Sequence, residues 1–413
     1  MEQTRLKIYA YRWIVLLAFM LVVIMNQLLW ITFAPVTSIA AGFYHVSDLS
    51  IGILSMSFML VYIFVSIPAS WVIDTYGFKV AVGIGAALTG VFGLTRGIFA
   101  DNFTLVLLSQ IGIAIGQPFI LNAITLVAAR WFPQGERATA SGMGSLAMYA
   151  GILIGLVVTP FLVLHSGFDR MLLSYGIISI IAAVVFIVFA KENPPTPASP
   201  PGHDERSLVF DGLKQILRNR NFILLMIVFF IGLGVFNSVT TWIEEILSPR
   251  HFTVTQAGMS GGLMITGGIV GAVILPLLSD YFRRRVPFIM LAISAATIGL
   301  IGITIATSYP VLLVSSFILG FFLLSAGPIG FQYGAEIAYP APEGTSNGLL
   351  LLMGQISGVL FIFGMDMYKS PVTGSMSRSL IILIVLMLLG LLLSARLREP
   401  SVLKSNVPAT KEL

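Results

Sequence analysis

Four side chains that can bind a solute without reacting with it lie within long apolar runs. They are one indole and three carboxamides: Trp30, Gln117, Asn237 and Gln355. Counted at about 1.5 Å per residue from the run ends, all four fall in the middle third of a membrane span. Aromatic faces attract cations, and amides hydrogen-bond without charge, so the set predicts binding of a small polar or cationic solute. The neighbours that extend this predicted site are Asn26, Gln27 and Phe236.

No acid, base or histidine is expected at the same depth. An anion site inside a membrane is expected to contain Arg or Lys, and a proton-coupled one Asp, Glu or His. Glu244 and Glu245 lie near the end of their run, where they either attract cations or simply mark the interface. Four scattered histidines and no cysteine give no metal-ligand spacing, so we expect no cofactor, no metal and no enzymatic activity.

In a second pattern, an acidic residue ends an apolar run and is followed by a tight turn and then by basic residues. It contains Asp74, Gly77 and Lys79, and it recurs about 200 residues later around Asp280 and Arg283. The recurrence predicts two similar halves.

Twelve apolar runs are long enough to cross a bilayer. They are 13–41, 51–73, 80–99, 103–129, 138–164, 171–190, 222–247, 255–279, 287–307, 310–338, 345–366 and 378–396. We expect a six-span half over 1–190, a proline-rich linker over 191–221 with a short amphipathic helix near 208–217, a second half over 222–397 and a tail over 398–413. Glycines of the fifth run predict a close interface between the halves: Gly142, Gly144, Gly151 and Gly155.

Composition supports a multi-pass membrane protein. Apolar residues make up 57% and charged residues 10%, against roughly 25% charged in soluble domains. The first run is too long for a cleaved signal peptide. Placing the N-terminus inside puts most of the 23 basic residues inside and leaves Arg96, Arg170, Arg250, Lys369 and Arg378 outside. Both termini and the linker are therefore expected to be cytoplasmic. The net charge of +5 is explained by basic residues that fix the orientation of the chain in the membrane, and not by nucleic-acid binding.

The loop at Ser70–Lys79 and the twelve runs resemble the major facilitator superfamily of secondary transporters. In that family the loop between the second and third helices has the form Gly-x-x-x-Asp-Arg-x-Gly-Arg-Lys. This chain matches it at Asp74, Gly77 and Lys79. The resemblance implies an all-α fold of twelve transmembrane helices in two halves, with helices 1, 4, 7 and 11 around one central site. It also implies a cytoplasmic gate in which Asp74 reaches the eleventh helix and Asp280 the fifth, beside Arg137.

A narrower resemblance is to the feline leukaemia virus subgroup C receptor-related branch, solute carrier family 49. It rests on segments in both halves: 11–17, 26–30, 117–121, 131–132, 336–340 and 343–350. It implies choline or ethanolamine transport, with haem export also proposed, and a cation held by positions matching Trp30, Gln117 and Gln355. The branch has a tyrosine where this chain has Asn237, which leaves Trp242 and Tyr333 as replacement aromatics.

The resulting hypothesis is a secondary transporter, most simply a monomer in the cell membrane, that moves a small organic cation or amino alcohol by alternating access. Uniport is favoured over proton symport because the site lacks a central acid. The alternatives left open are a proton-coupled drug exporter and a haem or porphyrin transporter. A membrane receptor that transports nothing is a third alternative, and it would be expected to carry an added soluble signalling domain.

Overall fold

The computed structural model describes residues 9–133, 136–196, 216–339 and 343–399. Across these residues the regular elements are helices, and twelve helical stretches are long and apolar enough to cross a membrane. Each lies within a few residues of its predicted run, except that the seventh helix ends at Thr241 instead of Leu247. The predicted amphipathic helix of the linker falls almost wholly outside the described residues.

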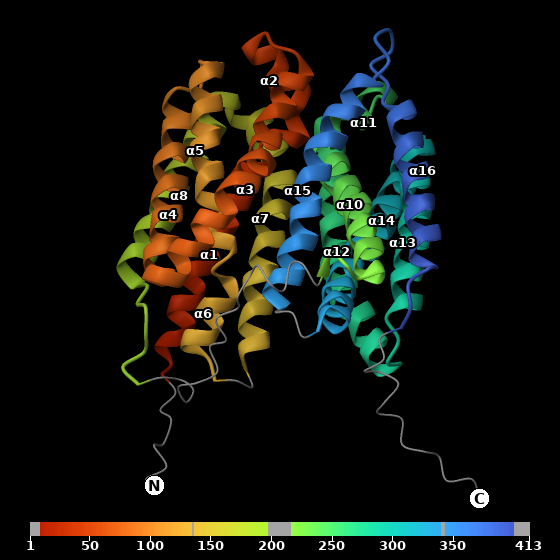
Figure 1. Cartoon of the computed structure of the whole chain (residues 1–413). Coiled ribbons are helices and arrows are strands. Elements are labelled where there is room, and N and C mark those ends of the chain that lie inside the picture. Colours follow the sequence, from red (N-terminus) through yellow and green to blue (C-terminus); the bar gives the residue numbers. More distant parts are fainter. Residues whose placement is uncertain (1–8, 134–135, 197–215, 340–342, 400–413) are drawn as a thin grey trace, which may run out of the picture. The chain divides into compact units, whose positions relative to one another are not determined.

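The first half supplies six spans (Figure 1). Its elements are α1 (Tyr11–Ile31), η1 (Ala34–Val36), α2 (Thr37–Tyr44), α3 (Asp48–Tyr76), α4 (Phe78–Ile98), α5 (Phe103–Leu121), α6 (Ile124–Trp131), α7 (Arg137–Ser166) and α8 (Phe168–Phe189). The second half supplies α10 (Arg220–Thr241), α11 (Ile243–Leu247), η3 (Ser248–Arg250), α12 (Val254–Tyr281), α13 (Val286–Ile305), α14 (Tyr309–Ala338), α15 (Glu343–Met367) and α16 (Ser377–Ser394).

Three of the spans are interrupted. The first breaks after Ile31, where Pro35 lacks the N–H that would bond to the Ile31 carbonyl. The fourth breaks after Leu121, following Pro118, and the seventh breaks at Trp242. Interrupted membrane helices leave backbone groups without helical partners and are common at transport sites.

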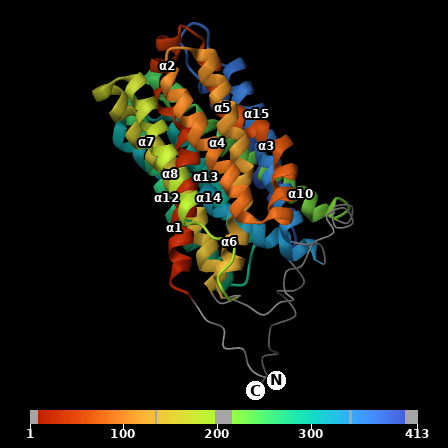
Figure 2. The same cartoon turned by 90° about the vertical axis from the view of Figure 1, so that its left-hand side faces the viewer.

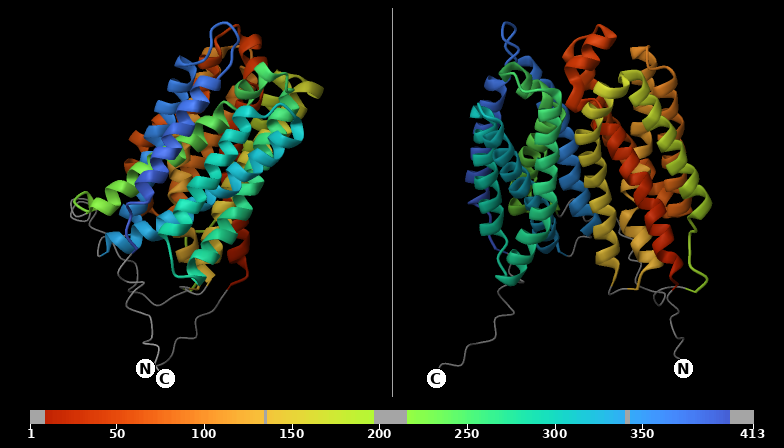
Figure 3. Two further views of the ribbon diagram at one scale, coloured as in Figure 1. Left: turned by 90° about the vertical axis from the view of Figure 1, so that its right-hand side faces the viewer. Right: turned by 180° about the vertical axis from the view of Figure 1, so that it is seen from behind.

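The chain forms two compact units. Unit 1 contains residues up to Glu205 together with Thr241–Ser248 and Thr253–Gly262; unit 2 contains the remainder. In unit 1, α4 packs against α5 and α8, and α1 against α7 and α8, while α2 and α6 lie at opposite ends (Figures 1 and 2). In unit 2, α13 packs against α14 and α16 (Figure 3).

Glycines permit the close approach of several of these helices. A Cβ on Gly85 would lie 2.7 Å from the Gly116 carbonyl oxygen, and one on Gly116 would lie 2.8 Å from that of Gly85, so α4 and α5 meet backbone to backbone. Gly151 and Gly155 of α7 contact Ile24 and Ile31 of α1. The prediction that these two glycines form an interface between halves is therefore wrong, because their near neighbours are in their own unit.

Large apolar side chains remain exposed on the sides of the bundles. Phe64 and Ile67 are 72% and 79% exposed. In water such surface would be unfavourable, whereas hydrocarbon solvates it well.

The ends of the two units that carry the aspartate loops repeat one set of hydrogen bonds. In unit 1 the carboxylate of Glu192 accepts from the backbone N–H groups of Phe78 and Lys79, which begin α4. The Trp131 indole N–H donates to the carbonyl of Lys191, 2.9 Å away. Glu192 therefore caps α4. The bond from Trp131 to Lys191 holds the backbone next to Glu192.

In unit 2 the carboxylate of Glu399 accepts from the N–H groups of Arg285 and Val286 at the start of α13. The hydroxyl of Tyr333 donates to the carbonyl of Arg398, also over 2.9 Å. The separation from the first capped residue to its glutamate is 114 residues in both units. The predicted internal repeat thus extends beyond the aspartate loops to a shared helix cap.

Candidate functional site

Trp30 lies one residue before the end of α1, next to the break in the first span. Its ring is buried, with 6% of the residue exposed, and its indole N–H donates to the Ser55 carbonyl of α3 over 3.2 Å. Because the polar N–H is already bonded within the protein, the π face of the ring is the part left to attract a solute.

A buried arginine lies beside this break. Arg96, in the last turn of α4, has no exposed surface, and its Nη1 donates to the carbonyl of Leu29 and to Oε1 of Gln110, at 3.0 and 2.8 Å. The Phe33 ring covers the guanidinium at 5.2 Å. The guanidinium of Arg96 thus lies at the level of Leu29, so the expectation that no charged group reaches the depth of Trp30 was wrong. Its place within an apolar run was the available signal.

Asn26 and Gln27 are both buried in unit 1. The amide nitrogen of Asn26 donates to Oγ1 of Thr89 and, over 3.5 Å, to the carbonyl of Ile113, so it links α1 to α4 and α5. Gln27 donates to Oδ1 of Asn26. The polar atoms of Asn26 are therefore engaged by protein, which favours a packing role for this predicted site residue.

Gln117 lies on α5 immediately before Pro118. It is 6% exposed, and its carboxamide makes no hydrogen bond within the part of the chain that the structure describes. Five residues further on, Asn122 occupies the break in the fourth span. Its amide donates to hydroxyls of Ser66 and Ser70, and its Oδ1 accepts from Tyr62 over 2.7 Å. Sequence reasoning missed this cluster, although asparagine within an apolar run was a signal.

In unit 2 the structure brings two predicted positions together. The amide of Asn237 on α10 donates to the carbonyl of Gly354, 3.1 Å away, and Gly354 directly precedes Gln355 on α15. Gln355 is half-buried, and its carboxamide has no hydrogen bond with any described residue. Phe236 is buried beside Asn237.

The two suggested replacement aromatics have other contacts. Trp242 packs on Gly52 at the start of α3, where a Cβ would lie 2.6 Å from the ring. The hydroxyl of Tyr333 donates to the Arg398 carbonyl beside the cap of α13 described above. Neither contact supports a role as the second aromatic wall of a central site.

Glu244 lies on α11 and is 3% exposed. Its carboxylate accepts from the backbone N–H and the hydroxyl of Ser38, at 2.9 and 2.8 Å. Ser38 is in the first turn of α2, so Glu244 caps that helix from another element of unit 1. Its engagement leaves it less suited to carry protons or to collect cations.

The two aspartate loops share one backbone feature, a residue with positive φ three positions after the aspartate. Gly77 has φ 85° and Arg283 φ 52°, so each loop turns through a left-handed residue at the corresponding place. A side chain at Gly77 would also collide with the carboxylate of Glu192. Asp74 and Lys79 are exposed, and Arg137 donates to the Phe132 carbonyl of its own unit.

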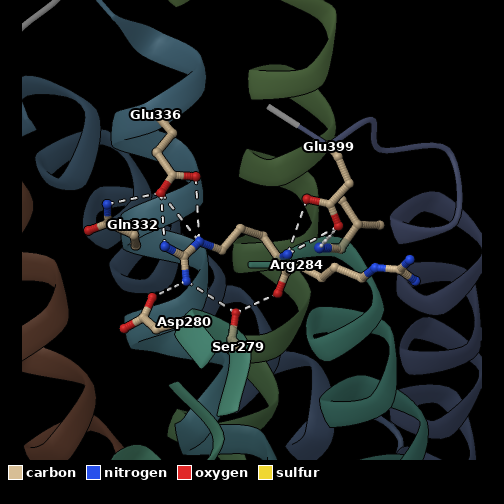
Figure 4. Close-up of polar contacts among 8 residues, drawn as sticks. Ser279, Asp280, Arg284, Gln332, Glu336 and Glu399 are labelled. Carbon is tan, nitrogen blue, oxygen red and sulfur yellow. Dashed lines mark hydrogen bonds and ion pairs between the residues drawn. The ribbon is translucent and has the colours of Figure 1, made fainter. Parts of the chain in front are cut away.

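Asp280 belongs to an ion-pair cluster inside unit 2 (Figure 4). Arg285 bonds both to Asp280 and, at 3.0 Å, to Glu336 of α14. Burial alone would lower the pKa of Arg285, but hydrogen bonds to Glu336 and Asp280 outweigh it and raise the pKa, so the guanidinium stays charged. The gate contacts predicted for Asp74 and Asp280 join different units and remain predictions.

The chain was compared with known proteins. Residues 16–362 match the family model described as Major Facilitator Superfamily. Solute carrier family 49 member A3 of Xenopus tropicalis is 30% identical over 87% of this chain and 78% of its own length. The protein named choline/ethanolamine transporter FLVCR1 of Felis catus is 30% identical over 94% of this chain and 73% of its own length. This chain belongs to the major facilitator superfamily, in solute carrier family 49.

A solved structure agrees with this fold. A bacterial homologue of the human lysosomal transporter Spinster, inward-facing and unoccupied, superimposes with a TM-score of 0.78, at 18% identity, over 95% of this chain and 98% of its own. The solute carrier family 49 chain is therefore a multi-pass membrane transporter of a small molecule, and the predicted fold class is confirmed.

Proposed function

We propose that this transporter carries a small organic cation or amino alcohol, of which choline and ethanolamine are the test cases. The observation that carries the proposal is Trp30, whose N–H is bonded to Ser55 while its ring lies at a helix break. The ring then offers a π face to a cation, and Gln117 offers an amide that bonds to none of the described residues. We further propose Gln355, with Asn237 and Phe236 beside it, as the contribution of unit 2.

FLVCR1, a relative of this chain, is named a choline/ethanolamine transporter, and this name supports the same substrate class. We also propose that the transporter is a monomer that works by alternating access, with both termini in the cytoplasm. Uniport is favoured over proton coupling because two of the carboxylates near the span ends are held by protein groups: Glu244 caps α2, and Glu336 pairs with Arg285.

The deciding experiment is thermal-shift screening of the purified protein against choline, ethanolamine, haem and an organic anion, followed by uptake into liposomes. We expect choline or ethanolamine to stabilise the protein, Trp30→Ala to abolish that effect, and Trp30→Phe to retain part of it. Trp71→Ala is the matched control, because Trp71 is 59% exposed.

Three results would contradict the proposal. Stabilisation by the anion alone, unaffected by Trp30→Ala, would point to a site organised by Arg96 instead. Stabilisation by haem alone would favour the porphyrin alternative. Uptake that requires a pH gradient would replace uniport by proton coupling.

A further inference from the structure

The end of α1 requires outside help to satisfy its backbone. The last four carbonyl groups of any helix lack intrahelical donors, and hydrocarbon offers no water to replace them. Thr32 satisfies one of these groups through its hydroxyl, which donates to the Leu28 carbonyl over 2.8 Å. The next carbonyl, that of Leu29, belongs to the peptide unit that leads directly into Trp30.

Two side chains from two other helices converge on that single carbonyl. Arg96 of α4 donates to it from Nη1 over 3.0 Å, and Gln110 of α5 donates from Nε2 over 3.2 Å. Arg96 and Gln110 also bond to each other, and Nη2 of Arg96 donates to Oγ1 of Thr32 over 3.4 Å. The arrangement therefore clamps the backbone on both sides of Trp30.

Burying this arginine is energetically costly. Both Arg96 and Gln110 have no exposed surface, and Nε of Arg96 has no hydrogen-bond partner among the described residues. Within the described part of unit 1 no carboxylate pairs with the guanidinium, which is stabilised by oxygen acceptors and the Phe33 ring instead. A neutral side chain would hold three helices together at lower cost, so the charge points to a demand for rigid placement.

We infer that Arg96, supported by Gln110, is a positioning residue for Trp30. The charge-assisted bond fixes the Leu29–Trp30 peptide, and the bond from the indole to Ser55 then fixes the ring. The inference rests on the proposed function for the claim that this ring meets the solute. Its structural part, the link from Arg96 to the Trp30 ring, does not depend on the solute.

The test uses the full chain labelled with 5-fluorotryptophan and ¹⁹F NMR. The chain has five tryptophans, and Trp30→Phe assigns the Trp30 resonance. Arg96→Lys and Gln110→Met should each displace that resonance by more than its linewidth. The Trp131 resonance, from the inner end of the same unit, should not move. Arg170→Lys, at an exposed arginine of α8, should move neither.

Choline uptake by the same variants in liposomes supplies the functional readout. Arg96→Lys should raise KM roughly tenfold, because small displacements of a contact group weaken binding steeply, while Vmax changes by about twofold or less. Gln110→Met should act in the same direction by a smaller factor, since it leaves the charged donor in place.

The outcomes separate the two claims. A Trp30 resonance unmoved by Arg96→Lys overturns the inference, as does an equal displacement of Trp30 and Trp131, which would mean a general loosening of the bundle. A displaced Trp30 resonance with unchanged uptake supports the positioning link and counts against the proposed contact between Trp30 and the solute.

Discussion

Asn26 and Gln117 carry similar carboxamides in unit 1 and use them differently. The amide of Asn26 is bonded to Thr89 and Ile113, whereas that of Gln117 has no partner among the described residues. That both residues lie on membrane-spanning helices could be predicted from the sequence, because length and apolar composition define the spans. Their different use could not, because it depends on which neighbouring helix each side chain faces.

We expect Asn26→Ala to lower the free energy of unfolding by about 1–2 kcal/mol, because a buried hydrogen bond between helices is lost. The KM of the protein that remains folded should not change. Thermal unfolding in detergent and initial uptake rates measure the two effects. A raised KM without loss of stability would return Asn26 to the binding site.

Gln117→Ala should give the opposite result. Its KM for the transported solute should rise roughly tenfold, the value of one hydrogen bond to a charged or strongly polar ligand, with little change in thermal stability. Gln117→Glu is an informative companion, since a carboxylate of the same shape should tighten binding of a cation and weaken binding of an anion. Loss of stability without a change in KM would mean that the amide supports the Pro118 kink.

At the scale of elements, the twelve spans could be predicted and the breaks in three of them could not. Apolar periodicity and length define a membrane helix, so the bounds agree within a few residues. Pro35 and Pro118 signalled interruption, but a helix can also continue through a proline, as α3 does at Pro68. The partners that stabilise a break, such as Arg96 or Asn122, come from distant parts of the chain and are set by packing.

The caps of α4 and α13 are expected to contribute separately to stability. Glu192→Gln and Glu399→Gln should each lower stability by about 1 kcal/mol, or about 2–4 °C, because the helix N-terminus loses a charged acceptor. Asp101→Asn, at an exposed carboxylate, is the control. Thermal unfolding of the two single variants and the double variant tests this, and a double variant no weaker than either single one would contradict independent caps.

The contact of Glu244 with α2 predicts a local change in dynamics. In Glu244→Gln the neutral amide binds the Ser38 N–H less strongly, so hydrogen exchange over Thr37–Tyr44 should become roughly fivefold faster. Asp169→Asn, in the first turn of α8, should leave that segment unchanged. Exchange that is unaffected at α2 would show that the carboxylate contributes nothing to holding this helix.

At the scale of the whole molecule, the repeat of the aspartate loops could be predicted from two short segments of sequence. The structure adds the matching left-handed turns at Gly77 and Arg283 and the matching caps. The ion pair between Arg285 and Glu336, which extends the cluster around Asp280, could not be predicted, because these two residues are 51 positions apart and meet only when α13 and α14 pack.

The gate function of Asp74 remains a prediction about the molecule as a whole. Asp74→Asn should change the ratio of inward- to outward-open forms by roughly fivefold, since one lost charge at a helix end is a modest coupling energy. Distance measurements between spin labels at the inner ends of the spans, with uptake in parallel, would detect it. Thr75→Asn, beside it in the same exposed turn, is the control. Unchanged populations and unchanged uptake would show that Asp74 only ends its helix.

The cap repeated in both units also sets an order of events during synthesis. Glu192 follows Lys79 by 113 residues, and Glu399 follows Val286 by the same number. The third helix of each half is therefore synthesised long before the carboxylate that caps it. Its first turn can gain this partner only after the sixth helix of that half has been synthesised.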